Sequence, residues 1–253
     1  MAFKDIKGQE KAVEFFRNSV SKDRLAHAYL FSGPQGLGKT LLAQNLAKFL
    51  NCENPVKKES SLIDCCDRCS SCRKIEGSNH PDVHWLETTG RSAKISIDQI
   101  RLMQKEISLK AYEGRFKVFI IQDAQRITEE AANCLLKTLE EPPDSSLVIL
   151  TCTNISGLLP TIISRCQIIK FFPLDYDTIK EILISDYALD QRYVHFLSAA
   201  SEGRIGRALS LKEDDSFAKK NRIIDKVCAT NRQESFAIFN IKDKRNLSTE
   251  LGY

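Results

Sequence analysis

One short stretch of this 253-residue chain has the residue types and spacing of a phosphate-binding loop. GPQGLGKT, Gly33 to Thr40, matches the pattern G-x-x-x-x-G-K-[ST] in full. In that pattern the glycines let backbone N–H groups point at phosphate oxygens, and here they are Gly33, Gly36 and Gly38. Lys39 then reaches the β and γ phosphates, and Thr40 ligates magnesium. The residues predict a site for ATP or ADP with Mg²⁺. The alternatives are a chance glycine-rich turn, or a loop that holds nucleotide only weakly or structurally.

A second group is a cluster of thiols within LNCENPVKKESSLIDCCDRCSSCRK. Four of them have the spacing of ligands in a closed, tetrahedral and therefore structural Zn²⁺ site: Cys52, Cys66, Cys69 and Cys72. Cys65 could replace Cys66, but only Cys66 keeps the C-x-x-C step. His80 and His84 are further candidate ligands, although His80 precedes a proline and better suits the start of a strand. Reduced, metal-free thiols are the other alternative.

The residues at the end of the apolar stretch VFIIQD differ from those expected in a site that hydrolyses ATP. A strand of this type in an ATPase usually ends in two carboxylates, one for magnesium and one that activates water, and here the pair is Gln122 and Asp123. Gln122 is neutral and Asp123 is one methylene shorter than Glu, so each change is expected to slow hydrolysis by orders of magnitude. Thr153, at the end of SLVILTCT, could sense a γ phosphate, although a threonine at a strand end is common.

These residues need a scaffold in which strands alternate with helices. Helix signals include Ser96 with Gln99 as a capping box, Thr128 as an N-cap, and Pro142-Pro143 as a stop. Strands are predicted at HAYLFSG, VHWLE, RFKVFIIQD and SLVILTCTN, and helices at KGQEKAVEFFRNSVSKDRL, TLLAQNLAKFL, SIDQIRLMQKEISLK and TEEAANCLLKTLEE. The alternation predicts an α/β fold with a parallel sheet that helices cover on both faces.

A change of pattern follows FFPLD, residues 171–175, which is predicted to be a hinge. Three helical segments then form a small all-helical domain up to about residue 211. Apolar content of 42% and charged content of 28% suit a globular protein, and the apolar runs fall short of the roughly 20 residues of a membrane helix. No secretory signal is visible at the start, so a cytoplasmic protein without membrane contact is expected. The net charge of +4 is weak evidence for a nucleic-acid neighbour.

Together these stretches resemble the bacterial clamp-loader family of AAA+ proteins. The resemblance covers residues 1 to about 211 and rests on HAYLFSGPQGLGKT, the cysteine insertion followed by HPD, LLKTLEEPP (135–143) and LPTIISRC (159–166). It implies an AAA+ nucleotide-binding P-loop domain at 1–172 with a zinc module at about 52–72, and a helical lid domain at 173–211. Residues 212–253 are then expected to start a helical collar domain that is incomplete.

Within that family, the gamma/tau ATPase subunit and the delta prime subunit carry the zinc insertion. The ATPase subunit keeps an Asp-Glu pair at the strand end and a sensor arginine in the lid. Alignment of GRIGRALSL on Gly203 and Ala208-Leu209 places Gly206 at the sensor position. Arg207 then falls one step on, about 100° round the helix. Both departures resemble delta prime subunits, whereas the complete phosphate loop favours a gamma/tau-type ATPase subunit, which remains the alternative.

The resemblance implies a role for Arg165 in the SRC motif. In the family, delta prime is a stator in a hetero-oligomeric ring, and this arginine completes the ATP site of a neighbouring ATPase subunit in trans. The implied partners are gamma/tau and delta subunits of the DNA polymerase III clamp loader, and through the complex the sliding clamp and primed DNA. The chain's own ATPase activity is then expected to be weak or absent. Arg165 as a surface ion-pair residue, and the chain as a zinc-dependent interaction module outside replication, are the alternatives.

Overall fold

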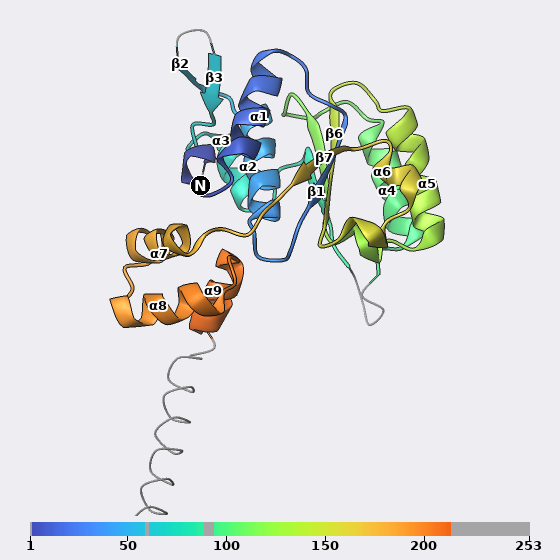
Figure 1. The fold of residues 1–253 in the computed structure, drawn as a ribbon. Coiled ribbons are helices and arrows are strands. Elements are labelled where there is room, and N and C mark those ends of the chain that lie inside the picture. The colour runs from blue at the N-terminus through green and yellow to red at the C-terminus, as the bar shows by residue number, and fades with distance from the viewer. Residues whose placement is uncertain (1, 59–60, 89–93, 214–253) are drawn as a thin grey trace, which may run out of the picture.

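The computed structural model describes residues 2–58, 61–88 and 94–213, and at its centre lies a five-stranded sheet (Figure 1). The strands have the order β4-β5-β6-β1-β7, and every ladder is parallel. Their bounds are β1 (Ala28–Ser32), β4 (Val83–Leu86), β5 (Lys117–Ile121), β6 (Ser146–Cys152) and β7 (Gln167–Lys170). The predicted parallel α/β sheet is confirmed. Because all strands run the same way, their carboxyl ends meet at one edge of the sheet.

Helices cover both faces of this sheet (Figure 1). One layer contains α1 (Glu10–Ser21) and α2 (Lys39–Asn51), and the other contains α4 (Ile97–Ile107), α5 (Glu129–Glu140) and α6 (Pro160–Ile163). Tyr29 and Phe31 of β1 pack into the first layer, whereas Leu30 packs into the second. The strands are therefore buried on both sides, which explains why they are nearly continuous apolar runs in the sequence.

The helix starts follow the predicted side chains. Ser96 accepts a hydrogen bond from the Gln99 amide at 3.5 Å, and the Gln99 side chain accepts one from the Ser96 amide at 3.0 Å. Thr128 accepts from the Ala131 amide at 3.3 Å and caps α5. Three short 3-10 turns complete this part of the fold: η1 (Phe3–Asp5), η2 (Ala124–Arg126) and η3 (Ile155–Gly157).

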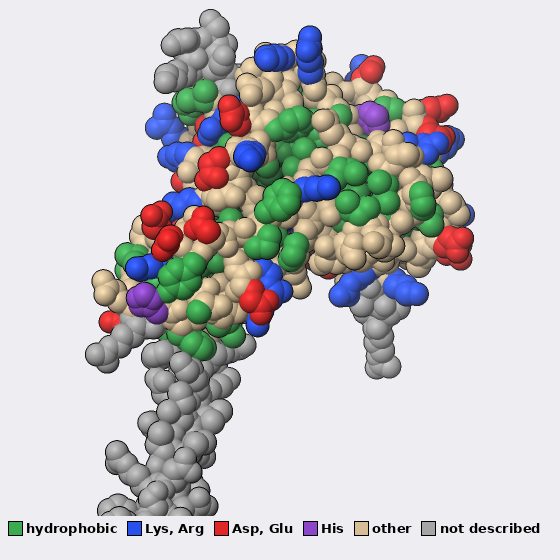
Figure 2. Space-filling model, viewed as in Figure 1, with side chains coloured by type: hydrophobic (Ala, Val, Ile, Leu, Met, Phe, Trp, Pro, Cys, Tyr) green, Lys and Arg blue, Asp and Glu red, His purple; other side chains and the backbone are tan. Residues whose placement is uncertain are grey.

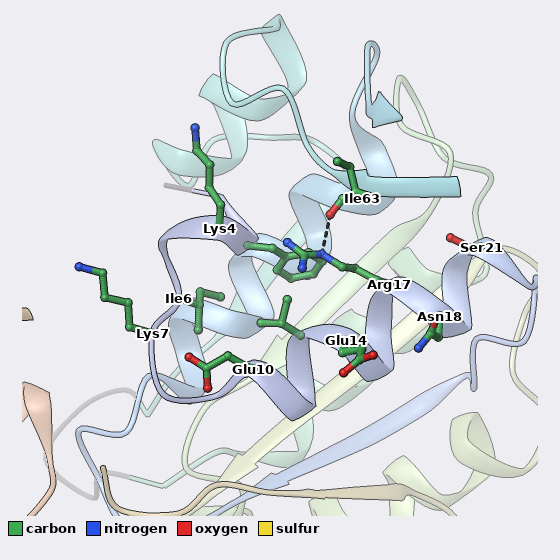
Figure 3. Close-up of a pocket in the computed structure, with 11 residues that line it drawn as sticks. Lys4, Ile6, Lys7, Glu10, Glu14, Arg17, Asn18, Ser21 and Ile63 are labelled. Atoms are coloured by element: carbon green, nitrogen blue, oxygen red, sulfur yellow. Dashed lines mark hydrogen bonds between the residues drawn. The ribbon is translucent and has the colours of Figure 1, made fainter. Parts of the chain in front are cut away.

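The cysteine segment forms elements that the sequence patterns did not predict. They are the antiparallel pair β2 (Val56–Lys58) and β3 (Ser61–Asp64), and the helix α3 (Ser70–Glu76). The Asp64 carboxylate accepts from the backbone N–H groups of Phe3 and Lys4, both at 3.0 Å. Arg17 of α1 donates to the Ile63 carbonyl at 2.6 Å (Figure 3). The segment is thereby tied to the N-terminal part of the chain.

A C-terminal helical unit consists of α7 (Tyr176–Ser185), α8 (Gln191–Ala200) and α9 (Ile205–Glu213), which pack around a core of their own. The connector at 171–175, predicted as a hinge, is held at several points. The Phe171 amide donates to the Ser32 carbonyl at 2.8 Å, and the Leu174 amide donates to the Gly203 carbonyl at 2.8 Å. The expected collar segment falls outside the described residues from position 214 onward.

The face that carries β7 and the connector has apolar side chains gathered near its middle, among scattered charges (Figure 2). Ile168 of β7 is 38% exposed, and Phe172 of the connector is 66% exposed. Among the helices formed by described residues, none combines the length and apolar character needed to cross a bilayer.

Candidate functional site

The predicted phosphate loop lies between β1 and α2, at the carboxyl edge of the sheet. Gly36 and Gly38 have φ values of +84° and +85°, a region that residues with a Cβ rarely adopt. A Cβ on Gly33 would lie 2.5 Å from the Phe171 carbonyl oxygen. The backbone conformation of the loop and its close approach to Phe171 therefore require glycine at these positions. Because α2 begins at Lys39, its first free N–H groups face the loop, an arrangement that favours anions.

Lys39 is 8% exposed, and its ammonium group lies over the loop. The Nζ atom donates to the carbonyl oxygens of Gly33 at 2.6 Å and Pro34 at 2.7 Å. Burial lowers the pKa of Lys39, while the neighbouring Cys152 and Asp123 act in the opposite sense. The loop therefore presents a cation beside the helix N-terminus, which is the chemistry that binds phosphate groups.

The end of β5 offers one carboxylate near Lys39. Asp123 has a left-handed backbone with φ +50°, donates its amide to Thr151 Oγ1 at 3.3 Å, and accepts from Gln125 Nε2 at 3.2 Å. Gln122 instead donates to Glu87 beyond β4 at 2.9 Å. The neutral Gln122 amide stands in place of a second carboxylate on this strand. The arrangement suits binding of a nucleotide better than activation of a water molecule.

A thiol occupies the position next to Lys39 at the end of β6. Cys152 is fully buried, and its pKa is raised by burial, which Ser32 and Lys39 partly oppose. Thr153, the predicted γ-phosphate sensor, is exposed and lies one residue beyond the strand. In the sequence Cys152 stands in the apolar stretch SLVILTC, where nothing marks it as a site residue. The register Ser32↔Cys152 between β1 and β6 would have found it, but that register requires the strand order.

The C-terminal helical unit contacts the phosphate loop directly. The Gly206 amide donates to the Gly36 carbonyl at 2.9 Å. A hollow of about 470 Å³ lies beside this contact, and Arg204 and Arg207 line it. Arg207 pairs with Glu202 at 2.6 Å. Two guanidinium groups therefore stand near the loop, although the predicted sensor position itself holds a glycine.

Two other hollows differ in the residues that line them. One of about 900 Å³ runs from Thr40 and Gln122 to the edge strand β4, so it adjoins the phosphate loop. The other, of about 510 Å³, lies between η1, α1 and β3 (Figure 3). Side chains of both charges line it, with Lys4 and Lys7 pointing outward and Arg17 crossing to Ile63. No residue predicted for nucleotide or metal binding contributes to this second hollow.

The four predicted zinc ligands come together in the fold. Their sulfur atoms all lie within 4.8 Å of one another, and those of Cys52 and Cys69 are 4.0 Å apart. A tetrahedral zinc site with Zn–S bonds of about 2.3 Å needs sulfur atoms about 3.8 Å apart. The donor set therefore fits one zinc ion. Cys65 is buried beside the cluster without being one of the four, and His80 contacts Ser71 and the Asp82 amide instead.

Local backbone geometry positions these sulfurs. Cys52 is the C-cap of α2, and Cys69 is the N-cap of α3, where it accepts from the Cys72 amide at 3.4 Å. The Cys66 amide donates to Cys52 Sγ at 3.2 Å. Burial alone would raise the pKa of Cys66, but backbone N–H donors from Arg68 and Cys69 lower it to about 7. Such amide–sulfur bonds favour the thiolate form that binds metal.

Arg165 lies away from the phosphate loop. It follows α6 in the layer formed with α4 and α5, whereas α2 covers the opposite face of the sheet (Figure 1). Its guanidinium pairs with Glu140 at 2.6 Å and donates to the Thr161 carbonyl at 3.0 Å. The Arg165 side chain is 34% exposed. The predicted site residues thus divide into a phosphate loop, a thiol cluster and one separate arginine.

Comparisons with known proteins identify the family of this chain. The family described as "DNA polymerase III, delta subunit" matches residues 8–175. The chain is 35% identical to DNA polymerase III subunit delta' of Bacillus subtilis over 237 residues, covering 93% of this chain and 69% of that protein. It is also 35% identical to subunit tau of Escherichia coli over 216 residues, covering 83% of this chain and 32% of that protein.

Among solved structures, RuvB of Thermotoga maritima, a Holliday junction branch migration motor, is similar in fold. The TM-score is 0.55 at 16% identity, covering 82% of this chain and 60% of that chain, so the likeness is one of fold alone. The family match and the delta' relative together carry the stronger conclusion. The chain belongs to the DNA polymerase III delta' family, and the gamma and tau subunits are further relatives.

Proposed function

We propose that this chain is a delta'-type subunit of a DNA polymerase III clamp loader, which does not itself drive hydrolysis. It supplies Arg165 to the ATP site of a neighbouring ATPase subunit. A guanidinium suits this role because it is always charged and offers a planar fork of donors to phosphate oxygens. Such a contact is worth about 10³–10⁵ in rate at the site that it completes.

The position of Arg165 relative to Lys39 is the observation that carries this proposal. The sheet separates them, because Lys39 begins α2 on one face and Arg165 follows α6 on the other. This separation supports a role for Arg165 toward a different chain and not toward its own loop. The ion pair with Glu140, whose carboxylate is half exposed, keeps the guanidinium at the surface until a phosphate group replaces that carboxylate.

Gln122 supports the non-hydrolytic part of the proposal. Its amide is bound to Glu87, so β5 presents a single carboxylate, Asp123, beside the phosphate loop. The loop retains the backbone and the lysine for holding ATP or ADP, with Thr40 available to Mg²⁺. We therefore assign the loop to nucleotide binding, which stiffens the domain. Zinc, when bound, cross-links the thiol cluster and has a structural role.

The proposed organisation follows from these assignments. Residues 1–172 form the nucleotide-binding domain, 173–211 the lid, and 212–253 the start of a collar that joins gamma/tau and delta subunits in a hetero-oligomeric ring. Through that ring the chain would act on the sliding clamp and primed DNA. The chain spans 69% of the delta' relative's length and 32% of that of the tau relative, so assembly is the step to test first.

The test is co-purification with the ATPase and delta subunits, followed by an ATPase assay with and without clamp and primed DNA. The expected result is a stable complex whose DNA-stimulated turnover requires this chain, while the chain alone turns over little ATP. Failure to bind either subunit would exclude the proposed role.

The second candidate is a gamma/tau-type ATPase subunit. One observation favours it: the phosphate loop is complete, and Lys39 and Asp123 are close enough to interact electrostatically. In this case the isolated chain should hydrolyse ATP, and that activity should rise when clamp and primed DNA are added. The two candidates therefore differ in the turnover of the isolated chain.

A further inference from the structure

Lys48 is a buried cation between α2 and the cysteine segment, outside the phosphate loop. It lies on α2 and is 1% exposed. Its ammonium group donates to Asp67 Oδ1 and to Glu76 Oε2, both at 2.7 Å. The two hydrogen bonds keep the pKa of Lys48 raised, although burial acts in the opposite sense. A buried charge that is held by two carboxylates on other elements fixes the relative positions of those elements.

Both carboxylates belong to the thiol cluster's own segment. Asp67 directly follows Cys66 and has a left-handed backbone with φ +58°, so it forms the turn between Cys66 and Cys69. Glu76 is the last residue of α3, about one helical turn after Cys72. Lys48 therefore binds the segment at two points, within the turn between Cys66 and Cys69 and at the end of α3 after Cys72.

The fourth thiol is attached to the helix that carries the lysine. Cys52 is the C-cap of α2, about one turn after Lys48. The relative position of Cys52 and the other three sulfurs therefore depends on how the segment docks on α2. The Lys48 hydrogen bonds are charge-assisted, and the Lys48 side chain is the most deeply buried of the three.

We propose that Lys48 is a positioning residue of the zinc site: its bonds to Asp67 and Glu76 hold Cys66, Cys69 and Cys72 in register with Cys52. This inference rests on the proposed zinc binding. Residues that orient metal ligands without touching the metal typically change metal affinity by about 10–100-fold when they are replaced. Loss of the ammonium group leaves the thiols present but no longer preorganised.

The chain offers matched controls in the same region. Lys74 of α3 pairs with Glu113 at 2.8 Å, but its side chain is 39% exposed and does not hold the turn between Cys66 and Cys69. Arg17 anchors β3 through Ile63, which lies before the clustered thiols (Figure 3). Lys74→Met therefore removes a lysine ion pair from the same segment while leaving the ligand turn in place.

The experiment uses the full chain and compares zinc affinity, by competition with a chromogenic chelator, in wild type, Lys48→Met, Lys48→Arg and Lys74→Met. Lys48→Met should weaken zinc binding by about 10–100-fold, and Lys74→Met should change it less than threefold. Lys48→Arg should retain more affinity than Lys48→Met because it keeps the charge. Substitution with Co²⁺ provides a second measurement, since the absorption bands of tetrahedral thiolate coordination should reach saturation only at higher Co²⁺ in Lys48→Met.

Further variants keep the test decisive if Lys48→Met does not fold. Asp67→Asn and Glu76→Gln each weaken one of the two bonds at partly exposed carboxylates, and each should lower zinc affinity by less than Lys48→Met would. Equal zinc affinity in wild type, Asp67→Asn, Glu76→Gln and any folded Lys48 variant would overturn the inference. Absence of zinc binding by the wild type would instead remove the proposed zinc site itself, so the two failures are distinguishable.

Discussion

The backbone of Gly206 rests on the backbone of Gly36. The Gly206 amide donates to the Gly36 carbonyl at 2.9 Å, and a Cβ built on Gly206 would lie 2.7 Å from Gly36 Cα. The last helix of the C-terminal unit therefore meets the phosphate loop at a distance that only glycine permits. The same residue stands where the resemblance places a sensor arginine, so this position provides close packing in place of a cation.

Gly206→Ala should loosen the contact between α9 and the phosphate loop. The added methyl group overlaps Gly36, and overpacking of this kind costs about 1–3 kcal/mol. Hydrogen exchange measured by mass spectrometry should be faster in residues 203–213. Gly77→Ala is the control, because its Cβ would meet no atom closer than 3.4 Å. Equal exchange in both variants and wild type would show that the contact does not hold the helix.

Zinc content should depend on Cys69 and not on Cys65. The Cys69 sulfur lies within 4.8 Å of the other three sulfurs, and Cys65 is outside that set. The purified chain should contain about one zinc ion, which Cys69→Ser should lose and Cys65→Ser should keep. Metal analysis by mass spectrometry checks this. Zinc retained at wild-type level in Cys69→Ser would contradict the ligand set.

The isolated chain should bind ATP or ADP but turn it over slowly. The loop and Lys39 motivate binding, whereas Gln122 removes a carboxylate from the hydrolytic position. Equilibrium titration with a fluorescent nucleotide and steady-state phosphate release measure the two properties. Lys39→Ala should abolish binding and serves as the control. Turnover of about 1 s⁻¹ or faster, within the usual range for enzymes, would contradict the prediction of slow hydrolysis.

Arg165→Ala should lower the DNA-stimulated ATPase of a reconstituted complex and leave this chain's fold, zinc content and nucleotide binding nearly unchanged. The loss should be partial, because the other ATP sites of such a ring take their arginines from other subunits. Arg24→Ala is a matched control, since Arg24 is an exposed arginine in the loop after α1. If Lys39→Ala cripples the complex while Arg165→Ala is silent, the chain works as an ATPase subunit instead.

Asp82 should make stability depend on pH in the acid range. Burial would raise the pKa of Asp82, but hydrogen bonds from the amides of Tyr112, Gly114 and Glu113 hold it below the usual value. The stabilisation is therefore complete above the unfolded-state pKa of about 3.9, and it is lost as pH falls through the lower folded-state value.

Asp82→Asn should accordingly cost about 1.5–3 kcal/mol near pH 7, and the difference from wild type should shrink below about pH 4. Urea unfolding followed by fluorescence of the single tryptophan, Trp85, measures both proteins at each pH. Zinc content is measured in both proteins at each pH, and only samples of equal zinc content are compared. A difference that stays constant down to pH 2 would count against the carboxylate as its source.

Local patterns in the sequence predicted the elements because those patterns report burial and capping within a single element. Four strands of the central sheet and the capped starts of α4 and α5 lie where apolar spacing and capping residues placed them, and three helices follow the connector as the pattern predicted. The cysteine segment was different. Its polar composition shows no strand or helix periodicity, so β2, β3 and α3 were not predicted. These elements are held by contacts with α1 and α2 and lie around the thiol cluster.

The sequence by itself determined which residues are available for chemistry. They are a phosphate loop, four thiols at ligand spacing, a strand ending in Gln122-Asp123 and the SRC arginine. The tertiary structure alone decided which of these meet. Cys152 lies beside Lys39 because β6 pairs with β1. Gly206 contacts Gly36 because hydrogen bonds hold the connector at Phe171 and Leu174. Lys48 binds Asp67 and Glu76 because the thiol segment folds back on α2. Each contact joins residues far apart in the chain, and periodicity carries no information about such pairs, since it records only which side of an element is buried.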